Sequence, residues 1–236
     1  MKIGVVGVSN GWSSQRLVEA FEQRTGFVCL LDMRDVRLDF ETGQARCNGL
    51  DLESLDGLVI KKIGSPYSAD MLDRLSMLRF LGSKGLSIFS DPTHIKRMLD
   101  RLSCTVTLRL GEIPMPPTVI TEDLDIAAET VHAYGKAVLK PIFTSKARGM
   151  KVIQCDQDVS ATLQAFRDAG NPVVYIQKLL NLPGRDLGLA FLGGEFLGCY
   201  ARKANGDAWN TTTRSGGKYE PHEPSAEIVA LARKAQ

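Results

Sequence analysis

The chain has 236 residues, of which 44% are hydrophobic and 24% charged, a composition that indicates a folded globular protein. A net charge of +2 gives no electrostatic reason to expect nucleic acid as a partner, and no apolar run reaches the roughly 18 residues that a membrane span needs. The five cysteines lack CxxC spacing and the three histidines form no metal-binding pattern, which argues against a zinc site and a disulfide framework and favours a cytoplasmic location.

The first ninety residues alternate between strand and helix patterns. Residues 2–8 predict a buried strand, and a Gly/Ser turn after it leads into a helix that ends near Arg24. Helical spacing of apolar residues returns from Ala69 to Leu81. Further strands are predicted at 27–31, at 55–64 before a turn at Ser65–Pro66, and at 86–89. This alternation indicates an open α/β sheet.

A strong helix start signal follows. Asp91 suits the N-cap and Pro92 the first helical position, and the apolar spacing predicts one helix that ends at Gly111. A proline-rich turn at 113–118 then separates this helix from a second series of elements. The predicted strands are 118–120, 137–140, 150–155, 173–180, 187–192 and 195–203, the last two joined by a Gly193–Gly194 turn, and the predicted helices are 122–134, 158–169 and one from Ser225.

Four local features suit the binding of a nucleotide or another anion. Lys140 ends an apolar strand before the loop 143–149, so its charge and the loop's N–H groups can face a phosphate. The run 173–180 can offer an apolar slot and backbone groups to a base. The polar segment 201–218 and the strand-end pair Lys61–Lys62 suit phosphate or carboxylate. Taken singly, each feature is explained as well or better by an ordinary core strand or a solvated surface.

Taken in chain order, these segments resemble ATP-grasp proteins of the RimK-like, glutamate-ligase type over nearly the whole chain. The resemblance implies an α/β structure in which the ATP-grasp fold is preceded by a small open α/β domain. It divides the chain into a pre-ATP-grasp domain at 1–90, an ATP-grasp small lobe at 91–178 and the start of an incomplete large lobe at 179–236. The motifs that carry it are VIKKIG (59–64), DPTHIKRMLDRLSCT (91–105), MPPT (115–118), VLKP (138–141), FTSKARGMKVI (143–153), QKLL (177–180) and AWNTTTRSGGKYEP (208–221).

The resemblance also implies roles for particular residues. Arg202 would act as the catalytic residue near the γ-phosphate and the acyl phosphate. Contacts with the carboxylate substrate would come from Lys62, Thr212, Arg214, Gly216 and Gly217. ATP contacts would come from Arg101, Lys140, Gly149, Gln177, Lys178, Leu179, Leu180 and Asp186, with the backbone of Lys178 and Leu180 facing the adenine.

The chain departs from the family pattern at several positions. Arg101 replaces a lysine, which keeps the charge but changes its geometry, and Lys178 replaces the hinge glutamate. Thr212 and Ser215 stand where asparagine and arginine are usual. No Glu-x-Asn motif, the family's source of magnesium ligands, occurs in the sequence, so no metal ligand is assigned and the ligands for Mg²⁺ are expected beyond Gln236. Either the chain is part of a longer protein, which is favoured, or it is naturally short.

The resemblance implies a ligase that uses ATP and Mg²⁺ to join a carboxylate to an amine. ATP would phosphorylate the carboxylate, and an amine such as glutamate or another amino acid would displace the phosphate. The alternative is a non-catalytic ATP- or ADP-binding regulatory module on the same fold. A third interpretation is an unrelated α/β binding protein without a nucleotide. The expected partners are ATP and the two substrates, without nucleic acid or membrane, and homo-oligomerisation is left open.

Overall fold

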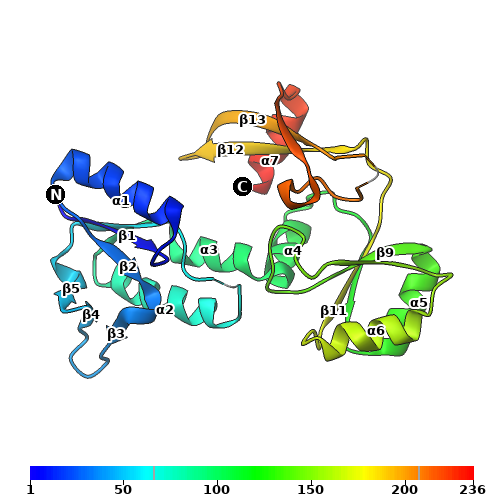
Figure 1. Ribbon diagram of the computed structural model, residues 1–236, viewed down its shortest axis with the longest axis horizontal. Helices are drawn as coiled ribbons and strands as arrows, with labels where there is room; N and C mark the ends of the chain where they lie inside the picture. Colours follow the sequence, from blue (N-terminus) through cyan, green and yellow to red (C-terminus); the bar gives the residue numbers. More distant parts are fainter. Residues whose placement is uncertain (66, 207) are drawn as a thin grey trace. The chain divides into compact units, whose positions relative to one another are not determined.

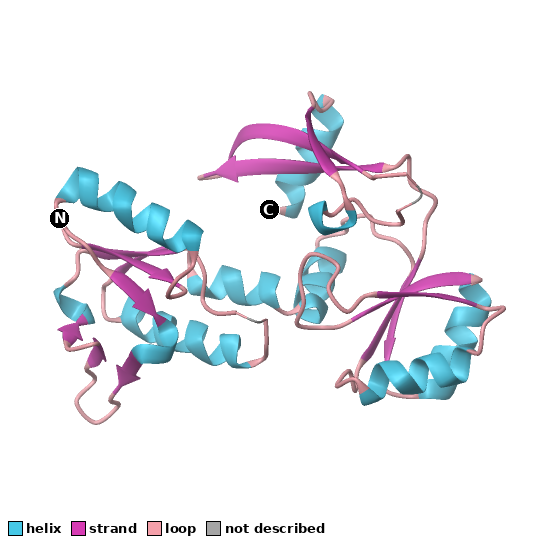
Figure 2. Ribbon diagram, in the orientation of Figure 1, coloured by secondary structure: helices cyan, strands magenta, loops and turns pink. Residues whose placement is uncertain are grey.

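A computed structural model describes residues 1–65, 67–206 and 208–236 (Figures 1 and 2). Pro66, in the predicted turn at Ser65–Pro66, and Asp207, in the polar segment 201–218, lie outside the described residues. The chain forms two compact units, Met1–Arg101 and Leu102–Gln236. Each unit is described by itself below.

The first unit contains a four-stranded parallel sheet. Strand β1 (Ile3–Gly7) lies at its centre, with β2 (Leu30–Asp32) on one side and β6 (Gly57–Ile60) and then β7 (Ser87–Phe89) on the other. This arrangement confirms the predicted open α/β sheet. Helices α1 (Trp12–Thr25) and α2 (Asp70–Ser83) supply the crossovers, and the core includes Val6, Leu31, Leu58, Leu75 and Leu78, each at most 1% exposed.

A small antiparallel sheet in this unit was not anticipated. It consists of β3 (Val36–Leu38), β4 (Ala45–Cys47) and β5 (Leu50–Asp51), flanked by the short 3₁₀ turns Met33–Asp35 and Leu52–Ser54. Strands of two or three residues are too short to show an alternating hydrophobic pattern, so the sequence carries no usable signal for them. Ala45, Cys47 and Leu52 nevertheless join the core of the unit.

The helix predicted from Asp91 to Gly111 is two helices. Asp91 caps α3 (Pro92–Leu99) by accepting a 2.7 Å hydrogen bond from Thr93 N–H, as predicted. Asp100 is extended, with φ −83° and ψ 111°, and separates α3 from α4 (Arg101–Leu110). Because an aspartate side chain competes for backbone hydrogen bonds, it favours a helix end over a helix interior, and the apolar spacing concealed this break.

The second unit opens with a four-stranded antiparallel sheet in the order β10-β9-β11-β8. Figure 1 shows α5 and α6 together on one side of it. Leu139 and Ile176 face these helices and are fully buried. The other face of the sheet is therefore left to carry polar groups. The elements are β8 (Thr118–Thr121), α5 (Leu124–Tyr134), β9 (Lys136–Lys140), β10 (Lys151–Gln154), α6 (Val159–Asp168) and β11 (Val174–Lys178).

A second antiparallel sheet follows in the same unit, in the order β12-β13-β14. Gly193 and Gly194 join the first two strands with φ values of 58° and 84°, which confirms the predicted two-residue turn. Strand β14 was not predicted. No helix within the described ranges is long and apolar enough to cross a membrane. The elements are β12 (Arg185–Leu192), β13 (Glu195–Lys203), the 3₁₀ turn Thr213–Ser215, β14 (Lys218–Pro221) and α7 (Ala226–Ala235).

Candidate active site

Lys140 projects from the sheet face opposite α5 and α6. It lies directly across from Tyr175 in the β9–β11 ladder, so both side chains, and that of Gln177 two residues along, share this face. Lys140 Nζ donates to Gln177 Oε1, and Gln177 Nε2 donates to Thr118 Oγ1 at 2.9 Å. These bonds fix which way the Gln177 amide points and hold the ammonium at the strand end.

Tyr175 forms the apolar wall beside this charge. Its ring centroid is 5.9 Å from Lys140 Nζ, and the side chain is 4% exposed. The Tyr175 hydroxyl is hydrogen-bonded at 2.9 Å to Thr105 Oγ1 on α4. Tyr175 and Gln177 are both neutral, so these two contacts orient the Lys140 ammonium without placing a negative charge beside it.

The end of β11 has an unpaired hydrogen-bonding edge. Lys178 N–H donates to Pro117 O at 2.9 Å, but Pro117 has no N–H with which to reach the Lys178 carbonyl. Leu179 N–H turns the other way and donates to Lys136 O, so Leu180 N–H lies on the same edge as the Lys178 carbonyl. No described residue accepts from Leu180 N–H. Pro117, Lys178 and Leu180 are exposed residues, and no described residue donates to the Lys178 carbonyl.

The loop after Lys140 returns close to its own start. Gly149 has φ 67°, a conformation that favours glycine, and a Cβ at this position would lie 3.1 Å from Pro141 Cγ. The β9–β10 loop is therefore pinched at its base, between Pro141 and Gly149. This closure keeps the intervening residues next to the strand end that carries Lys140.

Asp186 and Arg202 form a two-point ion pair on the second sheet. They lie directly opposite each other on β12 and β13, with Arg202 Nε 2.9 Å from Asp186 Oδ1 and Nη2 2.6 Å from Oδ2. Thr211 Oγ1 also donates to Oδ2, at 2.8 Å. Although burial opposes it, the pKa of Asp186 is lowered by the bonds from Arg202 and Thr211, and the Asp186 carboxylate raises the pKa of Arg202. Arg202 Nη1 is the guanidinium nitrogen that this carboxylate does not use.

The loop before β14 is folded tightly on itself. Thr212 N–H and Oγ1 contact Asn210 Oδ1 at 3.1 and 2.7 Å. Gly216 has φ 82°, and a Cβ on Gly217 would lie 2.1 Å from Thr211 O, so neither position accommodates a side chain. Arg214 is exposed on this loop. The structure thus brings four of the five predicted substrate residues, Thr212, Arg214, Gly216 and Gly217, into one rigid loop.

Lys62 and Arg101 belong to the first unit. Lys62 follows β6 at the carboxyl edge of the parallel sheet, where its N–H donates to Val6 O at 3.1 Å and its side chain is exposed. Arg101 is the first residue of α4. Their predicted contacts with substrate and phosphate remain predictions.

Sequence reasoning missed three residues of this site. Pro117 lies in the predicted turn, Thr118 in that turn and at the start of a predicted strand, and Tyr175 in a predicted apolar strand, but none of them is a predicted site residue. The available signal was the MPPT segment itself, because a proline beside a strand removes one ladder donor.

Comparison with known proteins gives this geometry its context. The family pattern described as "Prokaryotic glutathione synthetase, ATP-grasp domain" matches residues 105–236, more than half of the chain. The chain belongs to the ATP-grasp family. Relatives of this chain are ligases that join a carboxylate to an amine, and ATP-grasp ligases use ATP and Mg²⁺. The expected fold, family and enzyme class are confirmed.

Individual relatives agree with this assignment. A tetrahydromethanopterin:alpha-L-glutamate ligase of Methanosarcina acetivorans is 23% identical over 252 residues, covering 99% of this chain and 78% of the relative. A RimK domain ATP-grasp protein of Sphaerobacter thermophilus has a similar fold, with TM-score 0.71, 19% identity, and coverage of 99% and 80%. The ATP-grasp ligase PsnB, solved with a precursor variant, Mg and ADP, superposes with TM-score 0.72, 17% identity, and coverage of 99% and 80%.

The described part of this ATP-grasp chain does not fit a magnesium site. Across residues 1–65, 67–206 and 208–236, no group of three or more His, Cys, Asp and Glu side chains is placed to hold a metal ion. Asp186, the acidic residue of the candidate site, is already occupied by Arg202 and Thr211. No step of the reaction is therefore derived through the metal.

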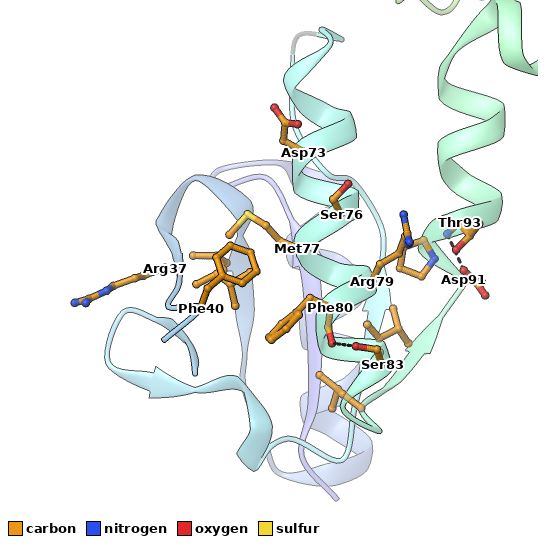
Figure 3. Close-up of a pocket in the computed structure, with 16 residues that line it drawn as sticks. Arg37, Phe40, Asp73, Ser76, Met77, Arg79, Phe80, Ser83, Asp91 and Thr93 are labelled. Atoms are coloured by element: carbon orange, nitrogen blue, oxygen red, sulfur yellow. Dashed lines mark hydrogen bonds between the residues drawn. The ribbon is translucent and has the colours of Figure 1, made fainter. Parts of the chain in front are cut away.

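The first unit has a large open cavity of about 1210 Å³ (Figure 3). Phe40 and Phe80 lie side by side in it as an edge-to-face pair 5.5 Å apart. Arg37, Arg79 and Asp73 stand around it. None of the predicted site residues lines this cavity.

Proposed function

We propose that this ATP-grasp ligase activates a carboxylate substrate as an acyl phosphate and transfers it to an amino acid, with glutamate as the first candidate. The observation that carries the proposal is that one sheet holds both the charged end of β9 and the segment Lys178–Leu180 at the end of β11, called the hinge. Lys140 ends β9, and the Lys178 carbonyl and Leu180 N–H are exposed at the end of neighbouring β11. The glutamate ligase name of the Methanosarcina relative supports the choice of amine.

The hinge has the hydrogen-bonding pattern that adenine needs. The Lys178 carbonyl accepts from the adenine amino group, and Leu180 N–H donates to the neighbouring ring nitrogen. Guanine presents the opposite pattern, an acceptor oxygen beside a ring N–H donor, so the hinge favours ATP over GTP. Gln177 and Leu179 support the hinge, Gln177 through its side chain and Leu179 through its bond to Lys136.

Cationic side chains bind the phosphates. Lys140, held by Gln177, places a point charge next to the α- and β-phosphates. The contact of the Arg101 guanidinium with the phosphates stays a prediction. The loop closed at Gly149 covers them with backbone N–H groups. Asp186 contributes by holding Arg202, whose free Nη1 points its N–H groups at the γ-phosphate.

The chemistry then takes two steps. A carboxylate oxygen of the substrate attacks the γ-phosphorus, the bond to the ADP oxygen breaks, and an acyl phosphate forms. The amine nitrogen attacks the acyl carbon, phosphate leaves with the bonding electrons, and the amine releases a proton to water. Arg202 stabilises the negative charge on the transferring group in both steps. The tightly folded loop of Thr212, Arg214, Gly216 and Gly217 holds the substrate carboxylate. The contact of Lys62 with the substrate stays a prediction.

Magnesium enters the proposal only as the partner of ATP, because the described residues provide no ligand set for it. The cytoplasmic location stays a prediction.

The test is ADP release in the presence of Mg²⁺, ATP, candidate acids and a pool of amino acids including glutamate. We expect Lys140→Ala to lower turnover at least about tenfold, since a charge on the phosphates is lost. Lys136→Ala is the matched control, because Lys136 lies on the same strand with an exposed side chain. Equal rates of ADP release in wild type and Lys140→Ala would reject the proposed ligase function. ATP-dependent thermal stabilisation without ADP release would support the regulatory alternative.

A further inference from the structure

The tip of the β9–β10 loop has an unusual backbone. Lys146 and Ala147 both have φ 56°, and Arg148 N–H donates to Ser145 O at 3.2 Å. Two successive positive φ values inside a four-residue hydrogen-bonded turn are the mark of a type I′ turn, which asparagine and glycine normally fill. Here a lysine and an alanine fill it instead.

This choice of residues strains the turn. A side chain with a Cβ clashes with its own backbone in the left-handed region, which lowers the population of that conformation by roughly tenfold for each residue relative to glycine. The following turn shows the contrast, because Met150 N–H donates to Ala147 O at 3.2 Å and the positive φ of 67° falls on Gly149. Some other interaction must hold Lys146 and Ala147.

The Arg148 side chain supplies that interaction. Its Nε donates to Ser145 O at 3.2 Å and its Nη2 donates to Ser145 Oγ at 3.0 Å. With the bond from Arg148 N–H, the residue that closes the turn makes three hydrogen bonds to the residue that opens it. Charged donors make stronger hydrogen bonds than neutral ones, and the planar fork fits two acceptors at once. Arg148 therefore holds the two ends of the strained turn together, and its hydrogen bonds to Ser145 form the Arg148 strap.

We infer that Arg148 is a positioning residue for ATP, which it serves by holding the Lys146–Ala147 turn in shape through Ser145. The inference rests on the proposed function. The loop begins directly after Lys140 and is closed at its base by Pro141 and Gly149, so the shape of its tip determines where its N–H groups lie relative to the phosphates. A loop already held in shape loses less entropy when the nucleotide binds.

The test combines removal of the strap with relief of the strain. ATP binding is measured by titration calorimetry at fixed Mg²⁺ for wild type, Arg148→Ala, and the double variant Arg148→Ala/Ala147→Gly. We expect about tenfold weaker binding in Arg148→Ala and recovery to within about threefold of wild type in the double variant, because glycine adopts the positive φ without help. Arg148→Lys should not recover affinity, because an ammonium lacks the planar fork.

The glycine rescue separates positioning from direct contact. An arginine that binds phosphate itself would not be replaced by a glycine at position 147, so failure of the double variant to recover would overturn the inference. So would unchanged ATP affinity in Arg148→Ala.

A second readout does not depend on the nucleotide. Cleavage after Lys146 by a lysine-specific protease should be faster in Arg148→Ala than in wild type, and equal rates would count against the strap. If wild type fails to bind ATP while cleavage still responds to Arg148→Ala, the proposed function is rejected and the strap is retained.

Discussion

Pro117 lies opposite Lys178 in the β8–β11 ladder, where it accepts the Lys178 N–H at 2.9 Å and has no N–H to return. A residue of any other type at this position would complete the pair and close the edge. The proline therefore ends the hydrogen bonding between β8 and β11 one bond early, at an exposed residue. The result is a carbonyl and, two residues on, an N–H that together match the edge of adenine.

Replacing this proline tests the hinge. Pro117→Ala supplies an N–H that competes with adenine for the Lys178 carbonyl, and one net hydrogen bond of about 1 kcal/mol corresponds to roughly a fivefold rise in the KM for ATP. Pro116→Ala is the control, because it makes the same chemical change at the preceding residue. It keeps the Pro116 carbonyl, which accepts a hydrogen bond from Thr118 Oγ1. An unchanged KM in Pro117→Ala would show that the Lys178 carbonyl does not bind the base.

The sequence predicted the elements better than it predicted the contacts between them. Apolar periodicity placed the strands of both four-stranded sheets and of the β12–β13 hairpin, but not β3, β4, β5 or β14. The order of motifs gave the family. The resemblance predicted that the backbone of Lys178 and Leu180 faces the adenine. The part of Pro117 could not be foreseen, because only the pairing register shows that it faces Lys178. Asp100 carried a local signal for the helix break, but the apolar spacing that continues across it concealed that signal.

The same limit applies to side-chain networks within the candidate site. Lys140 and Gln177 were each predicted to contact ATP, yet their mutual hydrogen bond depends on diagonal neighbours across two strands. The Arg148 strap depends on backbone dihedrals that no residue type in the segment normally prefers. Residue types suggest such roles, whereas register and dihedrals decide them.

The surroundings of Asp32 predict that the first unit becomes less stable as the pH falls. Its carboxylate is 3% exposed and accepts from Ser9 N–H at 3.0 Å and from Arg34 Nη2 at 2.7 Å. The hydrogen bonds from the Arg34 guanidinium, together with these backbone donors and against the effect of burial, hold the pKa of Asp32 far below its ordinary value. A lowered folded-state pKa stabilises the protein above the unfolded-state pKa near 4 and loses that contribution as the pH falls further.

We therefore expect Asp32→Asn to lower the free energy of unfolding by about 2 kcal/mol at pH 7. Below pH 4, the difference in free energy of unfolding between wild type and Asp32→Asn should decrease by about 1.4 kcal/mol per pH unit. Wild type then loses the contribution of the ionised Asp32 carboxylate, which the variant lacks at every pH. Urea unfolding at pH 7, 4 and 3 measures both effects. Asp35→Asn, an exposed change in the same segment, is the control. A gap that stays constant with pH would mean that Asp32 is not held as a carboxylate.

Gly217 gives the sharpest test of the substrate loop. A Cβ at this position would lie 2.1 Å from Thr211 O and 3.0 Å from Thr212 O, and both contacts are with backbone, which cannot rotate away. Moving Thr211 would also disturb its 2.8 Å bond to Asp186, the carboxylate that orients Arg202. The strain thus passes from a loop glycine to the proposed catalytic side chain.

We expect Gly217→Ala to destabilise the protein by about 1–3 kcal/mol and to lower turnover at least about tenfold, because the loop must shift to admit the methyl group. Gly198→Ala is the matched control, since a Cβ on that β13 glycine meets no heavy atom within 4 Å. Urea midpoints and ADP release for both variants separate stability from activity. Full turnover in Gly217→Ala would show that Thr211 and Arg202 can move without loss, and the 210–217 loop would then have no part in catalysis.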